Sequence, residues 1–78
     1  MLYMSVSKYY EKALSISREI GYRQGEGIML YNIGEIYKDK VDIPHAQQYL
    51  KNALTIFEEI KSPYAIQAQK LLEELGTK

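Results

Sequence analysis

The sequence predicts an all-α fold of about four helices. Apolar residues recur at steps of three and four along most of its 78 residues, which is the spacing of an amphipathic helix. Glycine and proline fall between these runs, where they typically end one helix and begin the next. No run alternates apolar and polar residues convincingly, as a half-buried strand would. We therefore expect four helices with short connections, at residues 2–20, 26–39, 44–60 and 63–75.

Local signals mark most ends of these helices. Gly21 follows the first apolar run and suits the left-handed conformation that often ends a helix. Asp42 is expected to cap the third helix, because its carboxylate accepts amide hydrogens of the first turn, where Pro44 is tolerated. Ser62 and Pro63 are expected to act as the cap and first residue of the fourth helix. The residues expected to face inward include Leu14, Leu30, Ile33, Tyr37, Tyr49, Leu50, Ala53, Leu54, Phe57, Ala68, Leu71 and Leu72.

Three further glycines lie away from these helix ends. Gly25 and Gly27 bracket Glu26 and are expected to form a turn, since this segment lacks the preceding strand and the lysine of a phosphate-binding loop. Gly34 lies inside the second helix, where glycine costs about 1 kcal/mol relative to alanine. Such a glycine usually has a packing reason, and we expect it to let Ala46 of the third helix come close.

The composition limits the possible classes of function. The chain is long enough for one small domain, and its apolar share of 46% fits a globular protein. Ten basic residues balance ten acidic ones, so general electrostatic binding of nucleic acid is not expected. Without cysteine and with one histidine, we expect no disulfide, no metal site and no cofactor. No apolar run approaches the roughly 20 residues of a membrane span and no leader is evident, so we expect an intracellular, cytoplasmic protein.

The first predicted helix is repeated in the third. Residues 9–16 align with residues 49–56, with Ala13 opposite Ala53 at an offset of 40 residues. A fixed period of this size indicates stacked units that bury their apolar faces on one another.

The second and third helices resemble the tetratricopeptide repeat. That family places large apolar residues, a small residue and an aromatic residue along its first helix, and alternates small and bulky residues along its second. The matching residues here are Leu30, Ile33, Gly34 and Tyr37, followed by Ala46, Leu50 and Ala53. The period exceeds the family's usual length of roughly 34 residues by about six, which is similar to the longer-repeat type. Val41 and Glu58 stand where the family usually has glycine and proline.

The resemblance implies an α-α superhelix of antiparallel helix hairpins in a single domain or fragment, residues 1–78. Its parts would be a half repeat at 2–20, a complete repeat at 27–60, and a terminal helix or half repeat at 63–76. In the half-repeat alternative, Leu72, Leu75 and Gly76 occupy repeat positions at an offset of 42 residues. In the other alternative, Gly76 is the cap that ends a terminal helix.

The resemblance also implies a non-catalytic protein-interaction function. In this family the first helix of each repeat lines a concave groove that binds a peptide or a partner helix. The residues expected to contact the partner are Ile28, Tyr31, Asn32, Glu35 and Lys38. Asn32 is the most suggestive, because an amide offers both a donor and an acceptor to a peptide main chain. The alternative for Asn32 is an exposed helical residue without a role.

A structural function, self-association, is the competing interpretation. Leu2, Val6, Tyr9 and Tyr10 leave an apolar end that no predicted helix covers. Stacking two chains or exchanging a helix would bury that end, and would make the protein a homo-oligomer.

An enzyme is not expected. His45 has no cysteine and no obvious serine partner, so we expect it at the surface or in a cap. The paired carboxylates Glu58-Glu59 and Glu73-Glu74 are adjacent on their helices and do not converge, so they are expected to be solvated. A carboxylate clamp, which some members of the family use for acidic peptide tails, is also not expected. Lys70 fits one basic position of such a clamp, but Glu74 stands where arginine is needed.

Overall fold

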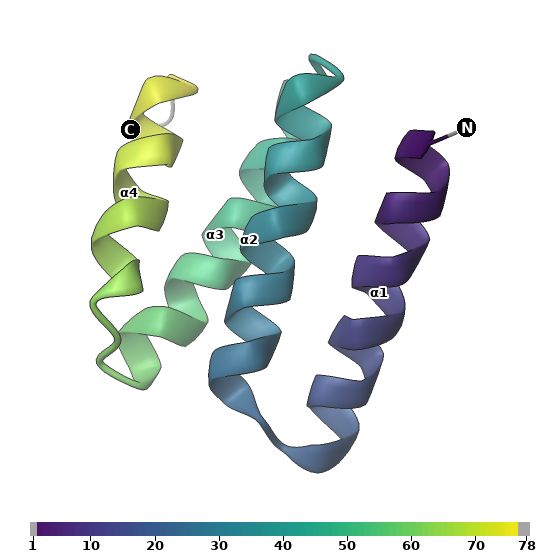
Figure 1. Cartoon of the computed structure of the whole chain (residues 1–78). Helices are drawn as coiled ribbons and strands as arrows, with labels where there is room; N and C mark the ends of the chain where they lie inside the picture. Colours follow the sequence, from purple (N-terminus) through teal and green to yellow (C-terminus); the bar gives the residue numbers. More distant parts are fainter. Residues whose placement is uncertain (1, 77–78) are drawn as a thin grey trace.

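The four helices pack in chain order into a flat slab (Figure 1). The computed structural model describes residues 2–76, with side chains from Lys8 onward, and measures about 32 × 32 × 15 Å. The helices are α1 (Leu2–Ile20), α2 (Arg23–Asp39), α3 (Ile43–Glu59) and α4 (Tyr64–Glu74). No strand occurs in residues 2–76, so the predicted all-α class with four helices is confirmed.

The three helix junctions share one geometry at a spacing of 20 residues. Gly21, Val41 and Lys61 each adopt a left-handed conformation, with φ of 74°, 61° and 57°. In each case the next amide donates a 2.8 Å hydrogen bond to the carbonyl five residues earlier: Tyr22 to Ser17, Asp42 to Tyr37, and Ser62 to Phe57. This bond is the mark of the Schellman motif, which satisfies carbonyls at a helix end. The left-handed cap predicted at Gly21 is confirmed, and the same turn recurs where the sequence has no glycine.

The predicted turn at Gly25-Glu26-Gly27 is wrong, because α2 begins at Arg23 and these residues lie in its first turns. Packing is the reason for glycine here. A Cβ atom at Gly27 would lie 2.6 Å from Cε1 of Phe57, the buried ring that α3 places against this part of α2. The glycine therefore serves close approach of the helices and not chain reversal.

The predicted caps agree with the structure in substance. The Asp42 carboxylate accepts the amide of His45 at 3.4 Å, and Pro44 lies in the first turn of α3. The Ser62 hydroxyl accepts the amide of Tyr64 at 3.1 Å, but α4 begins one residue later than expected, so Pro63 precedes it. Beyond α4, Gly76 is left-handed with φ of 86°, which agrees with the interpretation of Gly76 as a cap.

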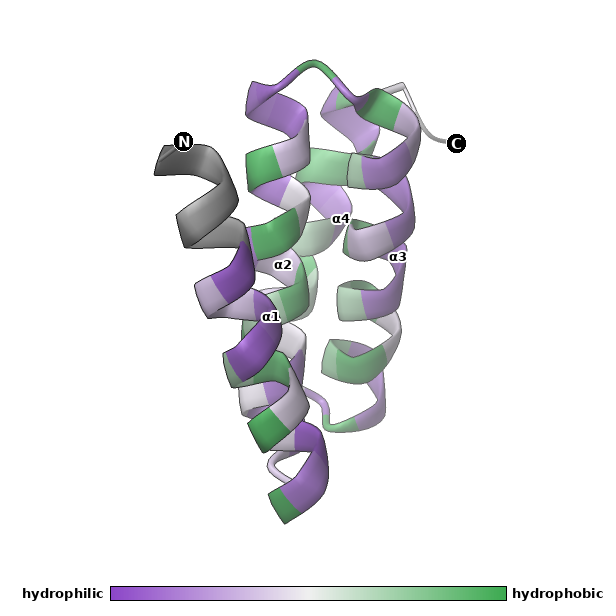
Figure 2. Ribbon diagram, turned by 90° about the vertical axis from the view of Figure 1, so that its right-hand side faces the viewer, coloured by the Kyte–Doolittle hydropathy of each residue, from purple (hydrophilic) through white to green (hydrophobic). Residues whose placement is uncertain are grey.

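The core lies between α2 and α3, whose hydrophobic segments face one another in Figure 2. Ile33, Ala46 and Leu50 are completely buried. Gly34 lies at the point of closest approach: a Cβ atom there would be 2.8 Å from Cγ of Leu50 and 3.4 Å from the carbonyl oxygen of Ala46. The predicted packing reason for Gly34 is confirmed, although Leu50 is its nearer neighbour.

The core also contains a residue that the repeat alignment did not single out. Ile56 is only 5% exposed and belongs to the main core cluster, whereas Ile16 at the equivalent position of α1 is 50% exposed. Tyr49 and Leu54, expected inward, are half-buried against that cluster.

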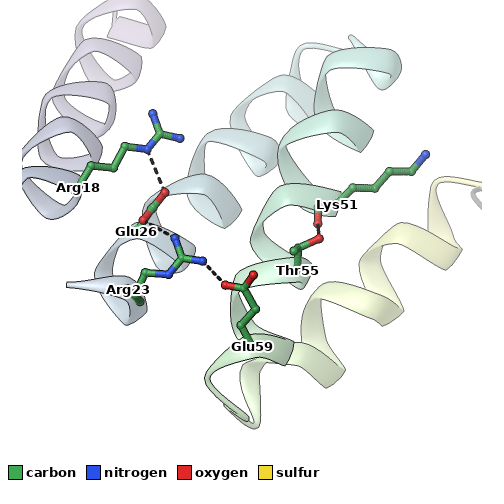
Figure 3. Close-up of polar contacts among 6 residues, drawn as sticks. All are labelled: Arg18, Arg23, Glu26, Lys51, Thr55 and Glu59. Carbon is green, nitrogen blue, oxygen red and sulfur yellow. Dashed lines mark hydrogen bonds and ion pairs between the residues drawn. The ribbon is translucent and has the colours of Figure 1, made fainter. Parts of the chain in front are cut away.

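An ion-pair network joins α1, α2 and α3 at the end of the slab that holds the α1–α2 connection (Figure 3). Glu26, which is 9% exposed, accepts Nε of Arg18 at 2.9 Å and Nη1 of Arg23 at 3.0 Å. Arg23 also pairs with Glu59 of α3, and the hydrogen bond to Glu59 is the main cause that raises the pKa of Arg23. A buried carboxylate held by two guanidinium groups fixes the two neighbouring helices on α2.

Gly34→Ala is expected to destabilise the fold. Overpacking against Leu50 costs about 1–3 kcal/mol, which outweighs the helix-propensity gain of about 1 kcal/mol. The net loss of about 1 kcal/mol would appear in urea unfolding followed by circular dichroism. Gly25→Ala is the matched control, because its new methyl group meets the half-exposed and movable ring of Tyr22, and its stability should be unchanged or higher. Equal losses in the two variants would contradict the close approach at Gly34.

Val41→Gly is expected to stabilise the protein. Val41 is 78% exposed, so no packing is lost, while a left-handed conformation costs a β-branched residue about 1–2 kcal/mol. Part of this gain is cancelled by the extra freedom of glycine in the unfolded chain, which leaves a gain of about 0.5–1 kcal/mol. Thermal unfolding measures the gain. Lys40→Gly, at an ordinary φ of −84°, should instead lower the melting temperature, and a similar rise in both variants would argue against left-handed strain.

Glu26→Gln is expected to loosen the packing of α1 and α3 on α2. The amide keeps the size of the side chain but removes the charge that both arginines bind, a loss of about 1–2 kcal/mol. Chemical unfolding measures it. Glu58→Gln, on an exposed part of α3, serves as the control and should change stability by less than about 0.5 kcal/mol. Indistinguishable stabilities of the two variants would mean that the network contributes nothing.

Candidate functional site

A small cavity lies between α2 and α4, next to the core. It encloses about 200 Å³ and is lined by Ile28, Tyr31, Asn32, Phe57, Tyr64 and Gln67. Pockets for drug-sized ligands usually enclose about 300–1,000 Å³. This cavity therefore matches one large side chain and not a whole small molecule.

The cavity brings together three of the five residues that sequence analysis proposed as contacts. Ile28, Tyr31 and Asn32 line it from α2. Glu35 lies one turn beyond Tyr31, close enough for its charge to act on the phenol. Lys38 is half-buried nearly one turn further along α2 and does not line the cavity.

The other lining residues come from α3 and α4 and were not proposed from the sequence. Phe57 forms the apolar wall, and its ring meets that of Tyr64 edge to face, with the centroids 5.6 Å apart. Because Phe57 is 1% exposed and packs against Gly27, this wall is fixed by the core. Gln67 supplies a second amide, across the cavity from α2. Finding these residues requires knowing that α4 lies beside α2, which the helical spacing of α4 alone does not give.

The two amides of the cavity are not engaged by other side chains. Among residues 8–76, neither Asn32 nor Gln67 takes part in a side-chain hydrogen bond, whereas Gln47 and Gln69 each make one. Each free amide carries donors and an acceptor. The cavity therefore pairs an apolar wall with unused main-chain-like hydrogen-bonding groups.

The electrostatic character at Tyr31 is acidic. Burial of the phenol is the main cause that raises the pKa of Tyr31, and the charges of Glu35 on α2 and Glu74 on α4 add to it. The two carboxylates thus approach the same phenol from two helices. An acidic ligand would be repelled here, while a cation next to Tyr31 would be favoured.

Two further cavities lie elsewhere in the slab and lack this combination. One, of about 260 Å³, lies between α1, α2 and α3, and another, of about 290 Å³, lies between α3 and α4. His45 borders the first, but its Nδ1 is 2.8 Å from the Asp42 carboxylate and its ring stacks on Tyr37 at 5.1 Å. This histidine therefore supports the start of α3, in agreement with the capping role expected from the sequence.

The part of the chain that the structure describes offers no metal centre. No group of three or more histidine, cysteine, aspartate or glutamate side chains within it is placed to hold a metal ion. None of the helices in residues 2–76 is long and apolar enough to cross a membrane.

Comparisons with known proteins leave the family of this chain open. No family model, no curated protein and no solved structure matches it. Its function is therefore inferred from the cavity between α2 and α4 and from the repeat in the sequence.

Proposed function

We propose that the chain is a non-catalytic protein-interaction module of the tetratricopeptide type, and that it binds an extended peptide segment in the α2–α4 cavity. The observation that carries the proposal is the pair of unengaged amides, Asn32 and Gln67, on two helices that flank one apolar cavity. The resemblance of residues 27–60 to a tetratricopeptide repeat supports it, because such repeats bind peptides along their first helices. In this chain α2 is that first helix.

The geometry suggests how a peptide is held. One large apolar or aromatic side chain enters the cavity against Phe57, Tyr64 and Ile28. The flanking main-chain groups of the peptide pair with the amides of Asn32 and Gln67, which read no side chain and so tolerate many sequences. Glu35 and Glu74, which both act on Tyr31, favour a lysine or arginine beside the anchor residue.

The affinity of a single site should be weak. Burying one large apolar side chain contributes about 1.5–3 kcal/mol, and each neutral hydrogen bond adds about 1 kcal/mol. Ordering the peptide offsets part of this sum. A dissociation constant near roughly 1 mM is therefore expected for a short peptide.

Binding is best measured by titrating the ¹⁵N-labelled protein with a blocked pentapeptide that has phenylalanine at its centre and lysine on both sides. The amide signals of Ile28, Tyr31, Asn32 and Gln67 should shift, while signals on the far side of α3 should not. The Tyr31→Ala/Asn32→Ala variant should bind at least about fivefold more weakly, because one hydrogen bond and part of the cavity wall are lost. Its helicity should be unchanged. Asn52→Ala, on an exposed position of α3, is the matched control.

The same titration tests the role of charge. A peptide in which glutamate replaces both lysines should bind more weakly, because Glu35 and Glu74 repel it. Tighter binding of the acidic peptide, or unchanged binding by the Tyr31→Ala/Asn32→Ala variant, would overturn the proposed site.

A further inference from the structure

Helix α1 carries two apolar faces, and only one of them is used. The inner face packs against α2 through Tyr10, Leu14 and the buried hydroxyl of Ser17. The second face is formed by Tyr9, Ala13, Ile16 and Ile20, and we call it the α1 seam. Tyr9 and Ile20 are each 70% exposed, although tyrosine and isoleucine are large apolar side chains. In Figure 2, where α1 stands in front of the other helices, hydrophobic segments lie on the side of α1 that faces the viewer.

The internal repeat shows that this pattern is a packing face. At the offset of 40 residues, Ala13 and Ile16 correspond to Ala53 and Ile56 of α3. Those two residues are 0% and 5% exposed, because α3 turns the same stripe into the core. Within the described residues no helix covers the stripe on α1. The α1 seam is thus a core-type face left in contact with water.

The seam is complementary to a second copy of itself. Its residues are spaced by four, three and four positions, which is the spacing of a coiled-coil seam. In an antiparallel pair with the two-fold axis between residues 14 and 15, Ala13 lies opposite Ile16 of the second copy. Tyr9 lies opposite Ile20 of the second copy. The smallest residue of the seam therefore faces a large one, which is how facing layers interdigitate.

The charges beside the seam point to the same arrangement. Lys12 and Glu19 are exposed, lie seven residues apart and flank the seam on one side. In an antiparallel pair this flank faces the same flank of the second copy, so each Lys12 approaches Glu19 of the other copy. Two such ion pairs follow from the symmetry, and no like charges face each other.

We propose that two copies of this chain associate through the α1 seam as an antiparallel, isologous pair. This contact is independent of the peptide site, because α1 lies on the far side of α2 from α4 (Figure 1). The pair would carry two separate α2–α4 cavities, so that a partner with two suitable segments binds both at once. With four seam residues per copy, the pair is expected to be weak, with a dissociation constant on the order of tens of micromolar.

The test is sedimentation equilibrium of the full chain between about 5 µM and about 500 µM. The mass should rise from 9.1 kDa toward twice that value with concentration. Ile16→Glu should remain a monomer over this range with unchanged helicity, because it places two carboxylates next to the two-fold axis. Ile66→Glu is the matched control: it changes an isoleucine of α4 that is 67% exposed and should leave the association intact.

A charge exchange tests the register of the helices. Lys12→Glu should weaken association at least about fivefold, because the new carboxylate would face Glu19 of the second copy. The double variant Lys12→Glu/Glu19→Lys should restore it, which a general effect on α1 stability would not do. A monomeric mass at about 500 µM would overturn the proposal. So would association that survives Ile16→Glu, or that is lost in Ile66→Glu instead.

Discussion

The close approach of α2 and α3 is the constraint on which the rest of the structure depends. Gly34 leaves room for Leu50, and Gly27 leaves room for Phe57, so one side of α2 meets α3 with its backbone almost in contact. Small residues at such points are the usual way in which two helices come within packing distance of bulky side chains. Once Phe57 is fixed against Gly27, it forms a rigid wall that α4 and α2 share. The candidate peptide cavity is therefore a consequence of how the α2–α3 hairpin closes.

The turns between helices impose the second constraint. Gly21, Val41 and Lys61 adopt the same left-handed conformation 20 residues apart, and each turn makes the same hydrogen bond to the preceding helix. Repeating one turn geometry after helices of similar length places successive helices in similar relations. The Glu26 network then links three of them at one end of the slab. Regular turns and one buried carboxylate thus hold the array, with a core that remains small.

Much of this arrangement follows from local sequence signals. The caps at Asp42 and Ser62 and the left-handed Gly21 depend on residues within a few positions, so the sequence predicts them well. Gly34 is also predictable, because glycine is costly inside a helix unless a neighbouring helix needs the space. In contrast, Gly25 and Gly27 resemble a turn in the sequence, and only the position of Phe57, thirty residues later, shows that they belong to a helix. The burial of Glu26 has the same cause, since the network around it joins three helices.

The candidate site shows the same division. Ile28, Tyr31 and Asn32 share one face of α2, so helical spacing and the resemblance were enough to group them. Tyr64 and Gln67 complete the cavity from α4, whose alignment with the repeat was ambiguous in the sequence. Burial on α1 and α3 was equally unpredictable: Ile16 and Ile56 have the same sequence context, yet one is exposed and the other is in the core. Their difference depends on which helices lie beside them.

A double-mutant cycle of Gly34→Ala and Leu50→Ala tests the central constraint most directly. If a methyl group at position 34 clashes with Leu50, truncating Leu50 relieves the clash. The loss from Leu50→Ala should then be smaller in the Gly34→Ala background than in the original chain, by at least about 1 kcal/mol of unfolding free energy. Losses that add within about 0.5 kcal/mol would show that the two residues do not meet, and would contradict the close approach by which this hairpin closes.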